Sequence, residues 1–324
     1  MEMSYRPLGR CGTKVSTFGL GGWTTFGGSL KEQALVDRLL ALAFERGVNF
    51  FDTADIYAKG ACELSMGQAL ASLPRHRLVL ASKLFWPMSA DPNDRGLSRK
   101  HILESVEKSL KRLGTDYLDI YFCHRFDSET PVLETVRAMD DLVRQGKILY
   151  WGTSEWSGGR IREAHRLAAE WRCHGPQVEQ PQHSLLARGR FEHDVLPACL
   201  ELGMGSVLWS PLASGLLSGK YDDGIPAGSR LDNPGFEWLK NTLLKPDTLE
   251  RVRRFGAVCA GRGLSRSQVA LAWAADRFGV SSVILGATSE AQLLENLAAL
   301  ELQLDGGLRA ELDAIFPDTL QATD

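Results

Sequence analysis

The stretch FFDTADIY, residues 50–57, is an apolar run that ends in an acid, Asp52, and is followed five residues later by a phenol, Tyr57. Short runs of this kind, rich in β-branched and aromatic residues, are typical of strands that are buried on both faces. Eight such runs occur along the chain. They are TFGLG (17–21), VNFFDT (48–53), LVLASK (78–83), LDIYFCH (118–124), ILYWGTS (148–154), QVEQ (177–180), GSVLWS (205–210) and SVILGA (282–287).

The segments between these runs are predicted helices. In 31–47, 98–114 and 130–146 the apolar residues recur at intervals of three and four, and each segment ends at a glycine. Ser98 is a predicted N-cap. Eight alternations of strand and helix, with no linker-like stretch between them, predict an α/β fold: a (β/α)8 TIM barrel formed by a single domain, residues 1–324.

A doubly wound sheet is the alternative fold. Its dinucleotide-binding fingerprint, G-x-G-x-x-G after the first strand, is missing, because GLGGWTTF (19–26) has no third glycine in place. We expect residues 5–17 to form a hairpin that plugs the closed end of the barrel. Two further segments depart from a minimal barrel. Residues 220–265 are too long for one connection, and residues 307–316 predict an extra helix after the last strand.

The overall composition of the chain excludes several kinds of binding partner and targeting segment. A net charge of −3 and a pI near 6.2 argue against nucleic acid or an anionic membrane surface. The six cysteines are scattered without a C-x-x-C, which favours reduced thiols and a cytoplasmic location. No stretch has eighteen uninterrupted apolar residues and the first ten residues have no apolar core, so we expect neither a membrane span nor a signal peptide.

Polar groups stand where successive predicted strands end. Asp52, Lys83 and His124 close the second, third and fourth strands, and Tyr57 follows in the loop after Asp52. Neighbouring strands lie about 4.8 Å apart, so these groups can converge at one rim of a barrel. Singly, each has an ordinary explanation, such as a helix cap for Asp52 or core packing for Tyr57. Their coincidence at consecutive strand ends favours catalysis.

The chemistry of this set is that of a proton donor. A free phenol has a pKa near 10, and we expect the Lys83 ammonium to lower the pKa of Tyr57. Asp52 would orient Lys83, and His124 would donate a hydrogen bond to the same carbonyl oxygen that the phenol protonates. No metal is required. A barrel hydrolase with paired acids is an alternative, but Glu179 should point away from the barrel interior if Gln180 points into it.

The stretches FFDTADIY, ASKLFW (81–86) and LDIYFCHR (118–125) resemble the aldo-keto reductase superfamily in order and spacing, from residue 4 to 316. Longer stretches resemble its voltage-gated potassium channel β-subunit group and the bacterial relatives of that group. These are RGLSRKHI (95–102), YWGTSEWS (150–157), WSPLASGLLSGKYDDGIP (209–226) and GVSSVILGATSEAQLLENL (279–297). The resemblance implies a catalytic tetrad in which Tyr57 is the general acid and Asp52, Lys83 and His124 tune it.

The implied reaction is NADPH-dependent reduction of aldehydes and some ketones, with NADH as a less favoured donor. Channel β subunits carry Asn where this chain has His124, a difference that favours reduction. An NADP(H)-binding regulatory protein of the channel β-subunit type, with slow turnover, is the alternative. The resemblance also implies a homo-oligomer, a tetramer or larger.

Other polar and aromatic positions are candidates for holding the dinucleotide. Ser154 and Gln180 can hydrogen-bond a carboxamide, and the Trp209 indole can stack on a nicotinamide ring. Lys220 and Arg230 follow a loop of small residues whose amides can approach a pyrophosphate. That loop is not a P-loop, since Ser214 replaces its first glycine. The further cofactor-binding candidates are Gly22, Trp23, Asp52, Ser210, Pro211, Leu212 and Ser214.

The last predicted strand leads into a helix, a junction that commonly holds phosphate in barrels. There the resemblance implies that Gly286, Thr288, Gln292, Glu295 and Asn296 hold the adenosine end. Trp23, Phe85 and Trp86, with Tyr57 and His124, would form an apolar substrate pocket for small or aromatic aldehydes. Two positions depart from the family pattern. These are Glu155, where channel β subunits carry Arg, and His183, where Tyr is common.

Overall fold

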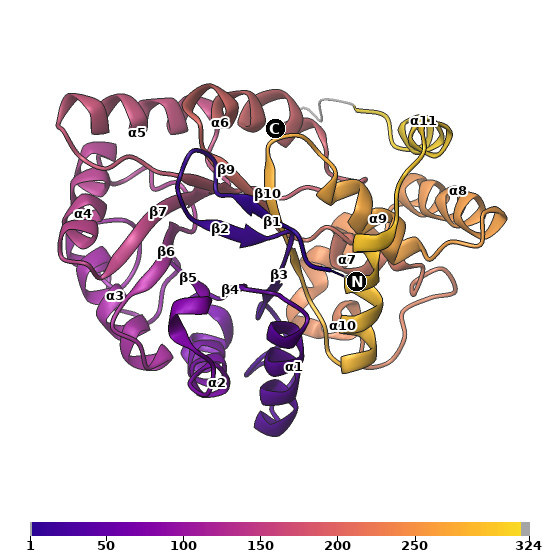
Figure 1. Ribbon diagram of the computed structural model, residues 1–324, viewed down its shortest axis with the longest axis horizontal. Coiled ribbons are helices and arrows are strands. Elements are labelled where there is room, and N and C mark those ends of the chain that lie inside the picture. The colour runs from indigo at the N-terminus through magenta and orange to yellow at the C-terminus, as the bar shows by residue number, and fades with distance from the viewer. Residues whose placement is uncertain (1, 319–324) are drawn as a thin grey trace.

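Eight parallel strands close into a barrel in the order β10-β3-β4-β5-β6-β7-β8-β9, in a computed structural model that describes residues 2–318 (Figure 1). The strands are β3 (Phe18–Gly21), β4 (Phe50–Asp52), β5 (Val79–Leu84), β6 (Leu118–Cys123), β7 (Ile148–Ser154), β8 (Val178–Gln180), β9 (Gly205–Leu208) and β10 (Val280–Leu285). Each predicted run overlaps one of them, so the (β/α)8 prediction is confirmed. Residues 1 and 319–324 of the predicted domain lie outside the described residues.

Helices surround the barrel (Figure 1). They are α1 (Gln33–Glu45), α2 (Ala61–Leu70), α3 (Arg99–Leu113), α4 (Val132–Arg144), α5 (Gly158–Glu170), α6 (Leu196–Leu202), α7 (Glu237–Leu243), α8 (Pro246–Gly261), α9 (Arg266–Ala275), α10 (Glu290–Leu297) and α11 (Gly306–Ile315). Ser98 caps α3 as predicted, because its hydroxyl accepts a hydrogen bond from the His101 amide at 3.2 Å. Within residues 2–318, none of these helices has both the length and the apolar character needed to cross a bilayer.

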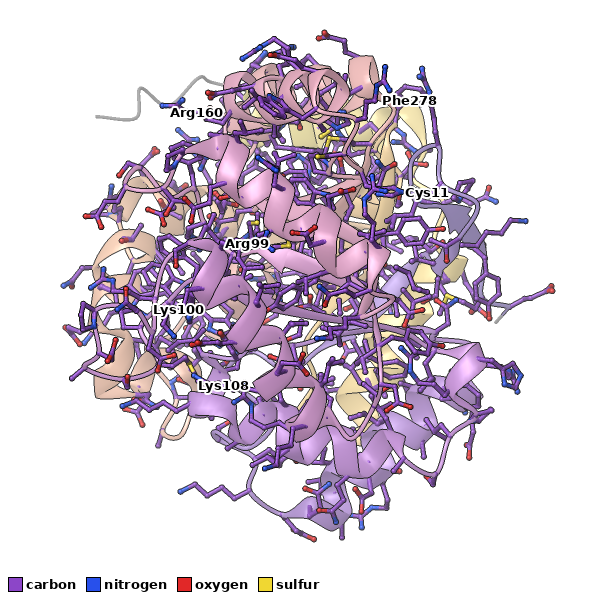
Figure 2. The ribbon with its side chains drawn as sticks, turned by 90° about the vertical axis from the view of Figure 1, so that its left-hand side faces the viewer. Cys11, Arg99, Lys100, Lys108, Arg160 and Phe278 are labelled. Carbon is purple, nitrogen blue, oxygen red and sulfur yellow. The ribbon has the colours of Figure 1, made fainter. Side chains whose placement is uncertain are left out.

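The predicted hairpin consists of β1 (Tyr5–Pro7) and β2 (Lys14–Ser16), which pair in antiparallel fashion. Leu8 and Val15 are fully buried and pack with the side chains that fill the inside of the barrel. The hairpin therefore closes one end of the barrel. Figure 2 shows Cys11 of this hairpin on one side of the molecule and Arg160, at the start of α5, on the other.

The long segment before β10 forms α7, α8 and several 3-10 turns ahead of α9. The α8 helix lies against α11, and the rings of Phe255 and Phe316 meet edge to face with their centroids 5.8 Å apart. The two departures from a minimal barrel thus pack together outside it (Figure 1).

Alternation along the strands decides which side chains face the inside. Phe50, Ala81 and Phe122 belong to the inner cluster of the barrel. Successive side chains on a strand point to opposite faces, so the residues two positions further along share this inward direction. Those residues are Asp52, Lys83 and His124. The core therefore places these groups in the next layer, towards the open rim.

The hairpin depends on a backbone position that only glycine satisfies. Gly9 has φ +60°, and a Cβ there would overlap the backbone of Gly203, Met204 and Gly205. We predict that Gly9→Ala lowers the free energy of unfolding by about 2–4 kcal/mol, from left-handed strain plus overpacking. Gly12→Ala in the same hairpin is the control, since a Cβ there meets nothing within 4 Å. Urea denaturation measures both variants, and equal stabilities would contradict the packing of the plug.

Candidate active site

Lys83 on β5 is the most deeply buried charge of the predicted tetrad, with 0% of its surface exposed. Its ammonium donates to Asp52 Oδ2 at 2.6 Å, to the Thr53 carbonyl at 2.7 Å and to Tyr57 Oη at 3.2 Å. An ammonium has three hydrogens, so its hydrogen-bonding capacity is used up by these acceptors. The lysine therefore links the carboxylate to the phenol directly.

Asp52 is held from its other side as well. Gln180 Nε2 donates to Asp52 Oδ1 at 3.0 Å, and the Ser154 hydroxyl donates to the Gln180 carbonyl at 2.8 Å. These bonds run from β7 through β8 to β4, across the barrel mouth. Ser154 and Gln180, which sequence reasoning assigned to the cofactor, are thus connected with the catalytic candidates in one network.

Tyr57 stands on a strained turn. The two residues after it, Ala58 and Lys59, have φ values of +48° and +51°, which are unfavourable for side chains other than glycine. Burial raises the pKa of Tyr57 well above its ordinary value, and the charge of Asp52 adds to this. The expectation of a lowered pKa for this phenol is therefore wrong for the structure, because the effect of burial dominates. The phenol is protonated at neutral pH, as a proton donor must be.

His124 follows β6 and continues its ladder, since its amide donates to the Leu84 carbonyl at 2.9 Å. Its ring lies edge-on to the Tyr57 ring, with centroids 5.7 Å apart. Burial, followed by the charges of Lys83 and Arg125, lowers the pKa of His124 well below 6.5. The imidazole is therefore neutral near pH 7 and can donate one N–H without adding a charge.

These groups open onto a cavity of about 720 Å³ at the barrel mouth. Four residues of the predicted substrate pocket line it, namely Trp23, Tyr57, Trp86 and His124. Most of the predicted cofactor-binding residues line it too, and they are Trp23, Asp52, Ser154, Gln180, Trp209, Ser210, Pro211, Leu212, Ser214, Lys220, Arg230, Gly286, Gln292 and Asn296. The residues predicted to bind the carbonyl substrate and those predicted to bind the dinucleotide therefore line the same cavity, although they come from segments far apart in sequence.

Three cofactor candidates lie off this cavity. A Cβ on Gly22 would collide with Cys62 of α2, so this glycine permits helix packing. Glu295 is exposed on α10 and accepts from the Ser265 hydroxyl at 3.1 Å. Thr288 reaches the site only through Gln292, to whose Oε1 its amide donates at 2.8 Å.

Phe85 also lies off the cavity. It packs edge to face against Trp86, with ring centroids 5.2 Å apart. Its contact with the predicted substrate pocket is therefore indirect, through the orientation of Trp86.

Glu155 is tied down at the mouth in a left-handed backbone conformation, φ +59°. Its carboxylate accepts from the Trp209 indole at 3.0 Å and from the Gln182 amide at 2.6 Å, and it pairs with Arg190 at 2.7 Å. The negative charge is thus compensated, and it fixes the ring of Trp209. Although Glu155 replaces the arginine of the family pattern, a positive charge remains at this place, because Arg190 supplies it.

His183 has a structural environment away from the cavity. It is fully buried, stacks on Trp273 with centroids 4.9 Å apart, and contacts Glu192 Oε1 at 2.9 Å. Arg188 joins Glu192 to Asp313 of α11. This network attaches the C-terminal helix to the barrel, so the replacement at position 183 concerns packing.

Glu179, the second acid of the hydrolase alternative, faces away from Asp52. It is fully buried and accepts from the Thr153 hydroxyl and from the Trp156 amide at 3.3 Å. Burial raises its pKa to about 8, so it is largely protonated at neutral pH. Paired acids are therefore not brought together across the mouth.

The part of the chain that the structure describes holds no group of three or more His, Cys, Asp or Glu side chains arranged to bind a metal ion.

Several cavity residues escaped sequence reasoning. Arg125 directly follows His124 and lines the cavity beside it. Asn233, Phe236 and Trp238 come from the long segment before β10 and line the cavity, and the Phe236 ring meets the Trp23 ring edge to face. The only available signal for Arg125 was its place next to a strand-end histidine. The loop residues had none, because their position depends on how the segment folds over the mouth.

Comparison with known proteins agrees with this geometry. The sequence profile of the Aldo/keto reductase family matches residues 17–316. The chain belongs to the aldo/keto reductase family. Family membership supports an oxidoreductase that acts with a nicotinamide dinucleotide.

Individual relatives are similar over nearly their full length. A protein of Oryza sativa subsp. japonica named "Probable voltage-gated potassium channel subunit beta" is 46% identical over 303 residues, which is 93% of this chain and 92% of the relative. A protein of the same name from Arabidopsis thaliana is 45% identical over the same shares. A protein of Schizosaccharomyces pombe (strain 972 / ATCC 24843) named "Putative voltage-gated potassium channel subunit beta" is 42% identical over 329 residues, which is 100% of this chain and 93% of the relative.

The buried ion pair should be essential to the stability of this reductase fold. We predict that Lys83→Met lowers the free energy of unfolding by about 3–5 kcal/mol, because it leaves the Asp52 carboxylate buried without a counter-charge. Adding Asp52→Asn should recover part of that loss.

Lys108→Met is the control for this pair. Lys108 is exposed on α3 and bonds Asp94 at 3.0 Å, and exposed pairs contribute only about 0–1 kcal/mol. Urea denaturation of the single and double variants measures the coupling. A Lys83→Met variant as stable as Lys108→Met would show that the pair is not a buried unit.

Proposed function

We propose that the protein reduces aldehydes, and some ketones, to alcohols with NADPH. The observation that carries the proposal is the 3.2 Å contact between the Lys83 ammonium and the Tyr57 hydroxyl at the base of the cavity. A phenol held protonated beside a buried cation suits one task, which is to give a proton to an oxygen on which negative charge develops.

The residues divide this task. Tyr57 donates its proton to the carbonyl oxygen as that oxygen becomes an alkoxide. Lys83 stabilises the phenolate that remains, and Asp52 keeps the ammonium charged and aimed at the phenol. The neutral His124 offers a hydrogen bond to the same oxygen and helps to orient the carbonyl group. When bound, NADPH supplies the hydride for the carbonyl carbon.

The mouth of the barrel fits such a cofactor. Trp209 presents an indole that Glu155 holds in place, and Ser154 and Gln180 offer polar groups beside it. After the neighbouring strand β10, a Cβ on Gly286 would meet nothing within 4 Å, so the backbone before α10 is open to a ligand.

The helix start and two cations suit the phosphates of the cofactor. Free amides at the start of α10 favour an anion, and Lys220 and Arg230 line the same cavity. Neither cation has an ion pair within residues 2–318. This charge balance favours the phosphorylated dinucleotide over NADH.

A regulatory protein with slow turnover is the second candidate, because the relatives above carry the name of a channel subunit. The two functions share the cofactor site and differ in the rate of carbonyl reduction. The proton-donating arrangement of Tyr57, Lys83 and His124 favours turnover.

We predict that Tyr57→Phe lowers kcat for reduction of 4-nitrobenzaldehyde by ~10²–10⁴-fold, since a positioned general acid typically contributes this much. The affinity for NADPH should stay within about twofold of the unmodified protein, because the ring and its packing are retained. Steady-state absorbance at 340 nm and NADPH fluorescence titration provide the two measurements.

Tyr150→Phe is the matched control, because Tyr150 is on β7 and does not line the cavity. Full activity in Tyr57→Phe would remove the phenol from the mechanism. No measurable reduction of any aldehyde by the unmodified protein, together with tight NADPH binding, would favour the regulatory function.

A further inference from the structure

Three cations line the cavity, namely Arg125, Lys220 and Arg230. Residues 2–318 provide no carboxylate within ion-pair distance of any of the three. Some exposed cations on the outer helices do have acidic partners. Figure 2 shows Arg99, Lys100, Lys108 and Arg160 there, and each is paired with an acid. Three cations without such partners that line one cavity give it a positive charge, which suits an anionic ligand.

Two of the three lie on the side assigned to the cofactor. Lys220 follows the loop that contains Ser214, and the Arg230 guanidinium lies over the Trp23 ring at 5.3 Å. The third cation, Arg125, has a different neighbourhood. It follows His124, and its guanidinium lies over the Trp86 ring at 5.6 Å, on the side of the predicted substrate pocket.

Arg125 has most of its hydrogen-bonding capacity free. Its Nη1 donates to the His124 carbonyl at 2.5 Å, and the described part of the chain provides no other acceptor. A guanidinium has five N–H donors in a flat fork. The Trp86 ring supports one face of that fork and leaves its edge available to a planar acceptor.

The carboxylates near Arg125 are already committed. Glu155 pairs with Arg190, and Glu179 is turned away between Thr153 and Trp156. The remaining charges of the tetrad cancel, because Lys83 is paired with Asp52 and His124 is neutral. Arg125 thus leaves an uncompensated positive charge at the carbonyl end of the cavity.

We propose that Arg125 is a specificity-determining residue that binds the carboxylate of the carbonyl substrate, so that the preferred substrates are aldehydes and ketones that bear a carboxylate group. A carboxylate accepts two parallel hydrogen bonds from a guanidinium. The neighbouring residue, His124, orients the carbonyl group, so both ends of a short oxo acid are held by consecutive residues. The inference rests on the reductase function proposed above and replaces the expectation that neutral small or aromatic aldehydes are preferred.

Matched substrates separate the carboxylate from the rest of the molecule. 4-Oxobutanoate and butanal have the same chain with and without the charge, and 4-carboxybenzaldehyde and 4-nitrobenzaldehyde form an aromatic pair. We expect kcat/KM to favour the carboxylate member of each pair. In Arg125→Gln this preference should fall roughly 10- to 100-fold, the range for a lost charge-assisted hydrogen bond.

Two further variants test whether the charge of Arg125 is responsible for the preference. Arg125→Lys keeps the charge and should retain part of the preference, mainly through KM. Arg166→Gln is the control, since Arg166 is exposed on α5 and pairs with Glu170. It should leave the preference unchanged. Thermal unfolding of each variant shows whether Arg125 only braces the loop through the His124 carbonyl.

A binding measurement makes the test independent of turnover. Benzoate has no reducible carbonyl, and benzamide is its neutral counterpart. Calorimetry in the presence of NADP⁺ should show that Arg125→Gln weakens benzoate at least ~10-fold, with little change for benzamide.

The outcomes distinguish the two proposals. If the unmodified protein reduces butanal and 4-oxobutanoate equally well, and Arg125→Gln leaves both unchanged, the role of Arg125 is overturned and the reductase stands. If no aldehyde is reduced, the reductase fails, and the benzoate titration alone decides whether Arg125 binds a carboxylate.

Discussion

The rim of this barrel has to compensate the charge of a lysine ammonium that has no contact with solvent. Lys83 is fully buried, and burial lowers its pKa, while the Asp52 carboxylate opposes that shift. The charge is retained at this depth because a carboxylate, a backbone carbonyl and a phenol surround it. The Asp52 carboxylate in turn accepts a hydrogen bond from Gln180, which lies on β8 on the far side of the barrel. Catalytic geometry here follows from the need to compensate one buried charge.

The loops around the rim are strained where they serve the site. Positive φ angles occur at Ala58 beside Tyr57, at Glu155 beside Trp209, and at Ser210 and Ser214 in the small-residue loop. Such conformations persist where surrounding contacts over-determine them. Glu155 is an example, since Trp209, Gln182 and Arg190 all hold its carboxylate. The strain therefore orients side chains towards the cavity.

The barrel itself was predictable because most strand residues are buried on both faces and most of the strands read as short apolar runs. The same logic located Asp52, Lys83 and His124, since a polar residue that ends such a run lies at a strand tip. It could not locate Phe236 or Trp238, which reach the mouth through a long irregular segment. It also missed the protonation behaviour of Tyr57, because the depth of burial that raises its pKa is a property of the folded mouth.

Glycines show the same limit. Both Gly22 and Gly286 directly follow a strand of the barrel, and the sequence does not distinguish their roles. Gly22 leaves room for Cys62 of α2, whereas Gly286 faces open space in the cavity. Arg125 was visible only as a neighbour of His124, and its importance follows from carboxylates being committed elsewhere. Which charges remain unpaired is decided by tertiary contacts, so it cannot be read from spacing.

The Tyr57 phenol should stay hydrogen-bonded to the Lys83 ammonium while a dinucleotide occupies the same mouth. A crystal structure of the protein with NADP⁺ would show both contacts at once. We expect the phenol oxygen to stay within hydrogen-bond distance of the ammonium, roughly 3.5 Å or less, and the nicotinamide ring to lie against Trp209. A phenol turned away from Lys83, or a nicotinamide bound outside the mouth, would contradict this expectation.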